Sequence, residues 1–382
     1  MNEDTSLINK KMAKEQESSV SLPPLPLPEP MPDADAYHRE RETRLEEYPE
    51  CRTNYQQYLA STGREADVDY LPIKLDIENV SRCNFRCRMC QVSEWTKGQR
   101  ADDMTLADFK SLIDEQTGLV EIKVTGMGEP LMAGDPLFDM IRYARERHIW
   151  VRSVTNASLL HLRDNYRKFI DSGVNELQVS IDGADKDVFE SIRGGSNFEK
   201  VVENCRLLNG YGKEIGRQRT KMWTMVQQRN HHQLFELVEL AEYMGFTSQV
   251  FSLDFTNWGQ DHWRDRNEST NLVSKIDLET GWRLVEDGKR RGIKVAFWNV
   301  AAKYDTAKPE QLCPWPFERA YVSSDRRVVP CCMIANPDVL EIGAMENGFT
   351  DVWHGQAFGD FRRAHQEGKI PAACRNCYKA DA

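Results

Sequence analysis

Short apolar runs alternate with amphipathic helical patterns from residue 71 onward. Six runs have the length and composition of strands, at 71–78, 119–125, 150–155, 176–182, 220–227 and 249–254. Helical spacing of apolar residues separates them near 105–116, 136–148, 162–171, 197–209 and 232–244, and a further helix and strand follow near 277–298. Strands that alternate with helices in this way form βαβ units around a parallel sheet. The pattern predicts an α/β fold, a partial (β/α)6 barrel over residues 71–300.

The two ends of the chain depart from this pattern. Residues 1–34 are polar and then proline-dense, which predicts a disordered tail or an extended proline-rich ligand segment. Residues 35–70 predict a helical segment that packs on the outside of the barrel. Residues 310–382 are rich in Cys, Pro and Trp without regular periodicity, and we expect them to form a small C-terminal domain.

Composition narrows the classes of partner. The 382 residues carry a net charge of −10 and a sequence pI near 5.5, so no broad basic field favours nucleic acid or an anionic membrane. No apolar run approaches the roughly 20 residues of a membrane span, and the first residues are polar and acidic where a signal peptide is basic and then apolar. The sequence therefore predicts a cytoplasmic protein.

Ten cysteines without an export signal favour metal or cluster ligation over disulfides. Seven of them have the close spacing of such sites. Cys51 and Cys205 stand alone and are interpreted as buried, inert thiols, while Cys332 adjoins Cys331.

Cys83, Cys87 and Cys90 follow the first predicted strand, at the end of a parallel barrel where ligand sites lie. Three thiolates on a four-iron cluster leave one iron open for chemistry. A zinc site would need a fourth ligand, and no His or Cys occurs between Cys90 and His148. The spacing resembles the CxxxCxxC motif of the radical S-adenosylmethionine (SAM) superfamily, although Met89 stands where that family usually has an aromatic residue. The resemblance implies a 4Fe-4S cluster that binds SAM and cleaves it to a 5′-deoxyadenosyl radical.

The same resemblance implies a set of SAM-binding residues. Gly126, Gly128 and Glu129 end the second strand in a turn similar to the family's GGE motif, where a carboxylate meets the methionyl ammonium group. Ser180, Asp182 and Arg193 lie in a stretch similar to the family's ribose- and carboxylate-binding segment, and an ordinary polar barrel interior with a capping turn is the alternative for them. Asn156 is similar to the family's TNG corner, although Ala157 replaces its glycine. These further expected SAM-binding residues are Asn156, Ser180, Asp182 and Arg193.

A second cysteine set lies near the C-terminus, where four thiolates would close a site. Its expected ligands are Cys313, Cys331, Cys374 and Cys377, with Cys332 as the alternative to Cys331. A zinc ribbon has similar spacing. The segment resembles the SPASM/twitch extension of radical SAM enzymes, which implies one auxiliary 4Fe-4S cluster. Arg326 stands where that family often has a hairpin glycine.

These resemblances predict an enzyme that removes a hydrogen atom from its substrate. An auxiliary cluster that accepts an electron favours a dehydrogenase of a sugar or aminocyclitol alcohol. The alternatives are modification of a ribosomally made peptide, epimerisation through a thiol such as Cys205 or Cys332, and a non-catalytic iron–sulfur or zinc protein. A small molecule or a peptide is thus the expected substrate, and flavodoxin or ferredoxin the expected electron donor. The polar and aromatic loop 254–260 and the pair Trp298 and Asn299 are candidate substrate contacts.

Overall fold

A ten-stranded sheet forms the centre of the computed structural model, which describes residues 22–61, 64–268, 276–299 and 303–379. The sheet order is β12-β11-β10-β1-β3-β4-β5-β7-β8-β9. Its strands are β1 (Lys74–Ile77), β3 (Glu121–Val124), β4 (Trp150–Thr155), β5 (Glu176–Ser180), β7 (Thr220–Met225), β8 (Ser248–Ser252), β9 (Lys294–Trp298), β10 (Arg319–Val322), β11 (Arg327–Val329) and β12 (Gly343–Ala344). Strands β2 (Arg86–Cys87) and β6 (Arg193–Gly194) pair separately.

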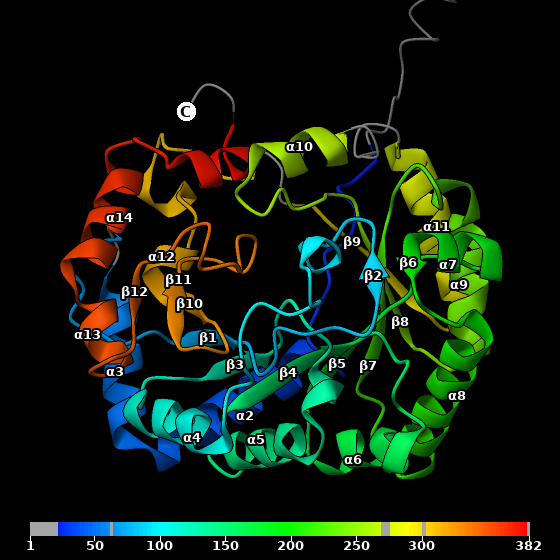
Figure 1. Cartoon of the computed structure of the whole chain (residues 1–382), viewed down its shortest axis with the longest axis horizontal. Coiled ribbons are helices and arrows are strands. Elements are labelled where there is room, and N and C mark those ends of the chain that lie inside the picture. The colour runs from blue at the N-terminus through cyan, green and yellow to red at the C-terminus, as the bar shows by residue number, and fades with distance from the viewer. Residues whose placement is uncertain (1–21, 62–63, 269–275, 300–302, 380–382) are drawn as a thin grey trace, which may run out of the picture.

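Helices surround the curved sheet on its outer side (Figure 1). They are α2 (Ala34–Glu47), α3 (Pro49–Ala60), α4 (Leu106–Glu115), α5 (Asp135–Arg145), α6 (Asn165–Asp171), α7 (Lys186–Ile192), α8 (Phe198–Glu214), α9 (Leu234–Tyr243), α10 (Asp261–Glu268), α11 (Leu278–Arg290), α12 (Trp315–Glu318), α13 (Phe349–Trp353) and α14 (Gln356–Gln366). The parallel order of β1, β3, β4, β5, β7 and β8 confirms the predicted partial barrel, and β9 extends it.

The two faces of the sheet differ in polarity because side chains alternate along each strand. Leu75 and Ile122 belong to the main hydrophobic core beneath the helices. Asp76, Lys123 and Arg152, which are partners in the strand register, occupy the alternate positions on the inner face. The barrel lumen is therefore charged, whereas the outer face of the sheet is packed with aliphatic side chains.

The C-terminal segment is continuous with the barrel sheet. Strand β10 pairs in parallel with β1, with Asp76 opposite Tyr321, and β11 and β12 add to it in antiparallel pairs. The sequence of this segment shows no regular periodicity because its strands are too short to give one. The consequence of the pairing of β10 with β1 is that both cysteine sets adjoin one sheet, the first after β1 and the second on either side of the β10–β11 pair.

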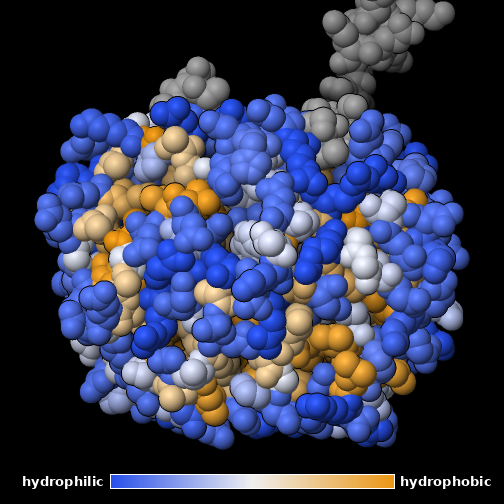
Figure 2. Space-filling view, viewed as in Figure 1, coloured by the Kyte–Doolittle hydropathy of each residue, from blue (hydrophilic) through white to orange (hydrophobic). Residues whose placement is uncertain are grey.

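The outer surface is mostly hydrophilic on the face that Figure 2 shows, where hydrophobic residues gather in small separate groups. None of the helices in the described ranges is both long enough and apolar enough to cross a bilayer.

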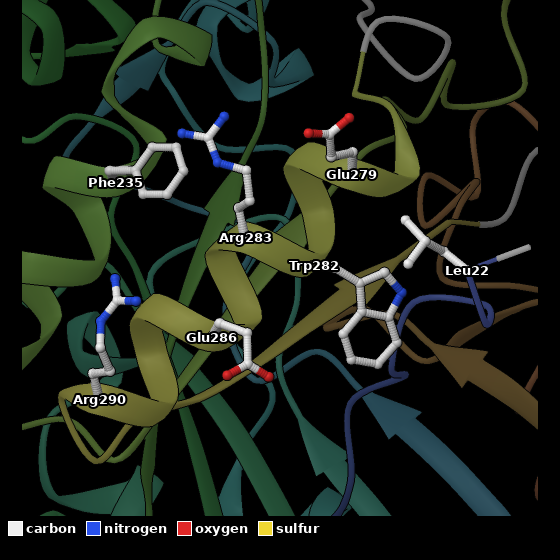
Figure 3. Close-up of a pocket in the computed structure, with 7 residues that line it drawn as sticks. All are labelled: Leu22, Phe235, Glu279, Trp282, Arg283, Glu286 and Arg290. Carbon is white, nitrogen blue, oxygen red and sulfur yellow. The ribbon is translucent and has the colours of Figure 1, made fainter. Parts of the chain in front are cut away.

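The proline-rich segment packs against the barrel from residue 22, which corrects the prediction of a disordered tail through residue 34; residues 1–21 lie outside the described part. The Pro26 carbonyl accepts the Phe297 N–H at 2.8 Å, and the Pro23 carbonyl accepts the Trp282 indole N–H at 2.8 Å. Prolines lack a donor but keep the carbonyl, so they can satisfy the free N–H groups of edge strand β9. Figure 3 shows Leu22 beside Trp282 in a hollow on the outer face of α11.

Helices α2 and α3 confirm the helical segment expected at 35–70. They cover the amino-terminal end of the barrel strands, where Arg44 donates to the carbonyls of Leu119 and Arg147. Tyr37 meets Trp150 edge to face, with ring centroids 5.2 Å apart. This end of the barrel is thereby covered, and the first cysteine set follows the opposite, carboxyl end of β1.

Candidate functional site

The first three cysteines lie in the loop after β1. Cys87 belongs to β2, which pairs with β6, and the Cys90 N–H donates to the Cys87 carbonyl at 3.0 Å. Burial, with a contribution from the nearby Cys87, raises the pKa of Cys83 and of Cys90 to about 12. Each thiol thus feels the charge of its neighbours, so the structure brings the three expected ligands together.

The donor set of this loop fits a cluster bound through three thiolates. Thiols with such high pKa values lose their protons when a metal takes their place. Arg193 supplies a positive charge, since its Nη1 lies 4.0 Å from the Cys87 sulfur. In the part of the chain that the structure describes, no three His, Cys, Asp or Glu side chains converge as tightly as a single metal ion requires.

Glu129 ends the turn after β3 and has one acceptor position left. Its carboxylate accepts the Thr155 hydroxyl at 2.8 Å, the Leu131 N–H at 3.3 Å and the Asn156 N–H at 2.7 Å. A carboxylate offers about four acceptor sites. Burial raises the pKa of Glu129 to about 7 in spite of these three donors. A ligand ammonium group would supply the missing donor and the missing positive charge, as the SAM assignment requires.

The glycines of this turn are needed for close packing against the cysteine loop. A Cβ atom on Gly128 would lie 2.2 Å from the Arg82 carbonyl oxygen, and one on Gly126 would lie 2.4 Å from Glu78 Cγ. The first contact is with backbone, which cannot turn aside. Gly128 therefore fixes the turn against the residue that precedes Cys83.

Asn156 joins the same assembly from the end of β4. Its Nδ2 donates to Asn84 Oδ1 at 3.0 Å and lies 3.9 Å from the Cys83 sulfur. The next residue, Ala157, has a φ of 63°, which is the left-handed conformation that glycine adopts most readily. A glycine stands at this position in the family's corner that Asn156 resembles. The corner keeps its shape although the glycine is absent.

Asp182 and Arg193 form a buried ion pair, with 2.7 Å between Oδ2 and Nη2. The other carboxylate oxygen accepts the Met225 N–H at 2.8 Å. Asp182 is thus positioned to hold the arginine beside Cys87. Ser180, which ends β5 opposite Trp223, lies on the inner face of the sheet.

Glu78 is a central residue of the site that the sequence analysis missed. It directly follows β1, is fully buried and accepts four hydrogen bonds of 3.0–3.1 Å, from the Met127 N–H, the Tyr321 hydroxyl, the Ser324 N–H and Arg100. It therefore connects the glycine turn to β10. The sequence did offer one indication of this role, because Glu78 is a charged residue at the end of a strand that was predicted to be buried.

The four expected C-terminal ligands also affect one another. Burial raises the pKa of Cys313 to about 12, with a contribution from Cys377. Burial also raises the pKa of Cys374, and Cys313 and Cys377 add to this shift. A hydrogen bond with Cys332 and burial raise the pKa of Cys331, to which Cys313 adds. This donor set of thiols fits a second cluster.

The loop that follows β8 lies between the two cysteine sets. The Trp258 indole N–H donates to the Met89 carbonyl at 3.2 Å, and the Thr256 hydroxyl donates to the Met333 carbonyl at 2.6 Å. Loop 254–260 was expected to contact substrate. These contacts give it a structural task, because Met89 precedes Cys90 and Met333 follows Cys332.

Comparison with known proteins identifies both parts of the site. Residues 79–241 match the family model described as the radical SAM superfamily, and residues 313–378 match the one described as an iron–sulfur cluster-binding domain, SPASM. The chain is 21% identical to the PqqA peptide cyclase of Bradyrhizobium diazoefficiens over 317 residues, 82% of this chain and 80% of that protein. It is 26% identical to the mycofactocin maturase MftC of Mycolicibacterium smegmatis over 329 residues, 81% and 76% of the two chains.

A solved structure, Streptococcus suis SuiB bound to the precursor peptide SuiA, has a similar fold. The TM-score is 0.61 at 16% identity, and the match covers 81% of this chain and 71% of that one. At this level of identity the likeness shows the fold alone.

Proposed function

Because the chain is a radical SAM enzyme with a C-terminal SPASM domain, we propose that its substrate is a peptide, whose C–H bond it activates and whose covalent structure it changes. The observation that carries the proposal is that sequence relatives matching about four-fifths of this chain are named for peptide cyclisation and maturation. The sequence analysis had preferred a sugar or aminocyclitol dehydrogenase, and the relatives favour its peptide alternative.

The cofactors are SAM, the cluster that cleaves it and an auxiliary cluster. When bound, they supply a 5′-deoxyadenosyl radical that removes a substrate hydrogen atom, and an acceptor for the electron that remains. The contribution of the chain is positioning, which matters because a misplaced C–H bond does not react. Ferredoxin or flavodoxin is the proposed electron donor.

Individual residues have distinct proposed roles in this positioning. Glu129 accepts the ammonium group of SAM with its free acceptor site. Arg193 stabilises thiolate charge at Cys87 and is held in place by Asp182. Cys83, Cys87 and Cys90 bind the first cluster.

Epimerisation would need a thiol that returns a hydrogen atom to the substrate, and one of the two candidate thiols is excluded. Cys205 is fully buried in the hydrophobic core on α8, where burial raises its pKa and no substrate reaches it. Cys332 is partly exposed and is the remaining candidate for returning a hydrogen atom.

The direct test supplies the anaerobically reconstituted enzyme with SAM and a strong reductant. Short peptides encoded beside the gene form one set of substrates, and polyols and aminocyclitols form the other. Formation of 5′-deoxyadenosine above the substrate-free rate, together with a peptide mass change, is the expected result. The control is the triple variant Cys83→Ala, Cys87→Ala, Cys90→Ala.

The outcomes separate the candidate reactions. A peptide that loses hydrogen and keeps its sequence indicates cross-linking or oxidation, whereas deuterium uptake from solvent without another mass change indicates epimerisation. Stimulation by aminocyclitols alone would refute the peptide proposal in favour of the dehydrogenase.

A further inference from the structure

A layer of charged side chains crosses the barrel lumen below the SAM-binding turn. Asp76, Lys123 and Arg152 are successive partners across β1, β3 and β4, and Glu176 continues the row on β5. Lys123 lies on the same strand as the glycine turn and precedes it. A substrate that enters from the open carboxyl end would meet this layer beneath SAM.

Positive charge exceeds negative charge in the layer as the structure describes it. Its cations are Lys74, Lys123, Arg152, Lys221 and Arg319, and its carboxylates are Asp76, Glu121, Glu176 and Glu318. A low-dielectric interior with surplus positive charge favours an anionic ligand.

The ion pairs of the layer leave Lys123 without a partner. Arg152 pairs with Glu121 at 3.3 Å and with Glu176 at 2.9 Å, and Lys221 also pairs with Glu176 at 2.9 Å. Lys74 and Arg319 both pair with Glu318. Across the described residues, Lys123 Nζ makes no hydrogen bond and no ion pair within 4.0 Å, although its strand partner is Asp76.

Lys123 occupies an inner-face position of β3. The side chain is partly exposed to the lumen, while its sequence neighbours Ile122 and Val124 are buried on the outer face. Burial lowers the pKa of Lys123, and the negative charges of Asp76 and Cys332 oppose this effect. Cys332, next to an expected ligand of the C-terminal set, is thus close enough to affect the charge of the Lys123 ammonium group.

We propose that Lys123, with Asp76 beside it, forms the floor of the substrate site and that its ammonium group binds a carboxylate of the substrate. The proposal rests on the peptide assignment above and adds a substrate class to it. In a peptide, the carboxylate belongs either to an acidic side chain or to the C-terminus. An ammonium–carboxylate contact in this lumen would hold the reacting residue at a fixed depth below SAM.

The test is anaerobic calorimetry of the reconstituted enzyme with SAM and without reductant. The probes are N-acetylglutamate amide, with a side-chain carboxylate; N-acetylglutamine, with a C-terminal carboxylate; N-acetylglutamine amide, which is neutral; and gluconate, a sugar acid. Wild type is compared with Lys123→Met, Lys123→Arg and the exposed control Lys200→Met on α8.

We expect wild type to bind one carboxylate probe at least about tenfold more tightly than the neutral probe, the scale of one charged hydrogen bond. Lys123→Met should lose this preference, Lys123→Arg should keep part of it, and Lys200→Met should match wild type. Lys123→Met should also be as stable as wild type or more so, because it removes an unpaired, desolvated charge. A purely structural lysine would instead lose stability on substitution.

Each other outcome has a definite meaning. Binding of gluconate alone, dependent on Lys123, would uphold the carboxylate site and refute the peptide proposal. A carboxylate preference that survives in Lys123→Met would overturn the Lys123 proposal and leave the peptide proposal intact. A changed auxiliary-cluster spectrum in Lys123→Met with unaltered probe binding would overturn it as well, as would failure of every carboxylate to bind.

Discussion

Replacing Glu78 with glutamine should destabilise the protein more than any change at an exposed carboxylate. The wild-type side chain accepts four hydrogen bonds, two on each oxygen. Glutamine keeps the shape and one oxygen but places an amide N–H2 against two donors. Whichever way the amide turns, one pair of donors loses its acceptor and Arg100 loses a charge partner.

The size of the effect follows from these lost contacts. Breaking a buried ion pair costs about 3–5 kcal/mol when one charge is left behind. Arg100 retains Asp325 at 2.7 Å, which places the loss at the lower end of that range. An unsatisfied backbone N–H, at Ser324 or Met127, adds about 1–3 kcal/mol. We expect a total of about 4–6 kcal/mol, a large part of the roughly 5–15 kcal/mol that holds a protein folded.

The measurement is urea unfolding followed by circular dichroism and by tryptophan fluorescence, on anaerobic samples of equal iron content. Glu203→Gln is the matched control, because Glu203 lies exposed on α8 with only Arg206 as partner, and should change stability by less than about 0.5 kcal/mol. Tyr321→Phe removes a single donor and should cost about 1 kcal/mol. A loss below about 1 kcal/mol in Glu78→Gln would show that Glu78 does not connect the two halves of the sheet.

Three further predictions concern the turn at Arg326, the ligands of the auxiliary cluster and the binding of SAM. Arg326→Gly should stabilise the protein by about 1 kcal/mol in urea unfolding, because Arg326 holds a φ of 62° and gives up only an exposed ion pair; a destabilised variant would refute the strain. Cys331→Ala should reduce the iron content from about eight to about four per chain, whereas Cys332→Ala should keep about eight; the reverse pattern would make Cys332 the ligand. SAM affinity measured by calorimetry should fall by up to about tenfold per unit of pH below 7, because protonation of Glu129, with its pKa of about 7, removes the charge that meets the ammonium group. The Glu129→Gln variant should bind SAM more weakly than wild type and with an affinity that does not change with pH. An unchanged wild-type affinity at pH 6 would contradict this role.

The barrel and its cofactor loops could be predicted because their signals are local. The strand 150–155 was predicted at its observed bounds, since a run of β-branched residues between a helix and an asparagine turn gives both ends. The spacing of Cys83, Cys87 and Cys90 lies within one loop. Arg326 and Ala157, noted as departures from the family's glycines, both adopt the positive φ that glycine would provide.

The remaining features depend on contacts between distant parts of the chain. Glu78 and Tyr321 are 243 positions apart, and no period along the chain indicates that β1 and β10 pair. The proline-rich segment has no helical or strand pattern, and its position follows only from a free N–H on Phe297 that a Pro26 carbonyl can satisfy. The alternation of charged residues in β1 and β3 was visible, but buried parallel strands are usually apolar on both faces. That departure was the available sign of a charged lumen.

Side chains that are not expected cluster ligands connect the two cysteine sets. Gln91, directly after Cys90, accepts the Asn336 amide at 2.9 Å, and its own amide lies 3.7 Å from the Met127 sulfur in the SAM-binding turn. All three side chains are buried, so water cannot replace these contacts cheaply. In the proposed reaction a substrate would lie between the two sets and would depend on this spacing. The buried Gln91 and Asn336 amides fix the loop after Cys90 against the segment that follows Cys332, which gives these polar groups a structural reason to be buried.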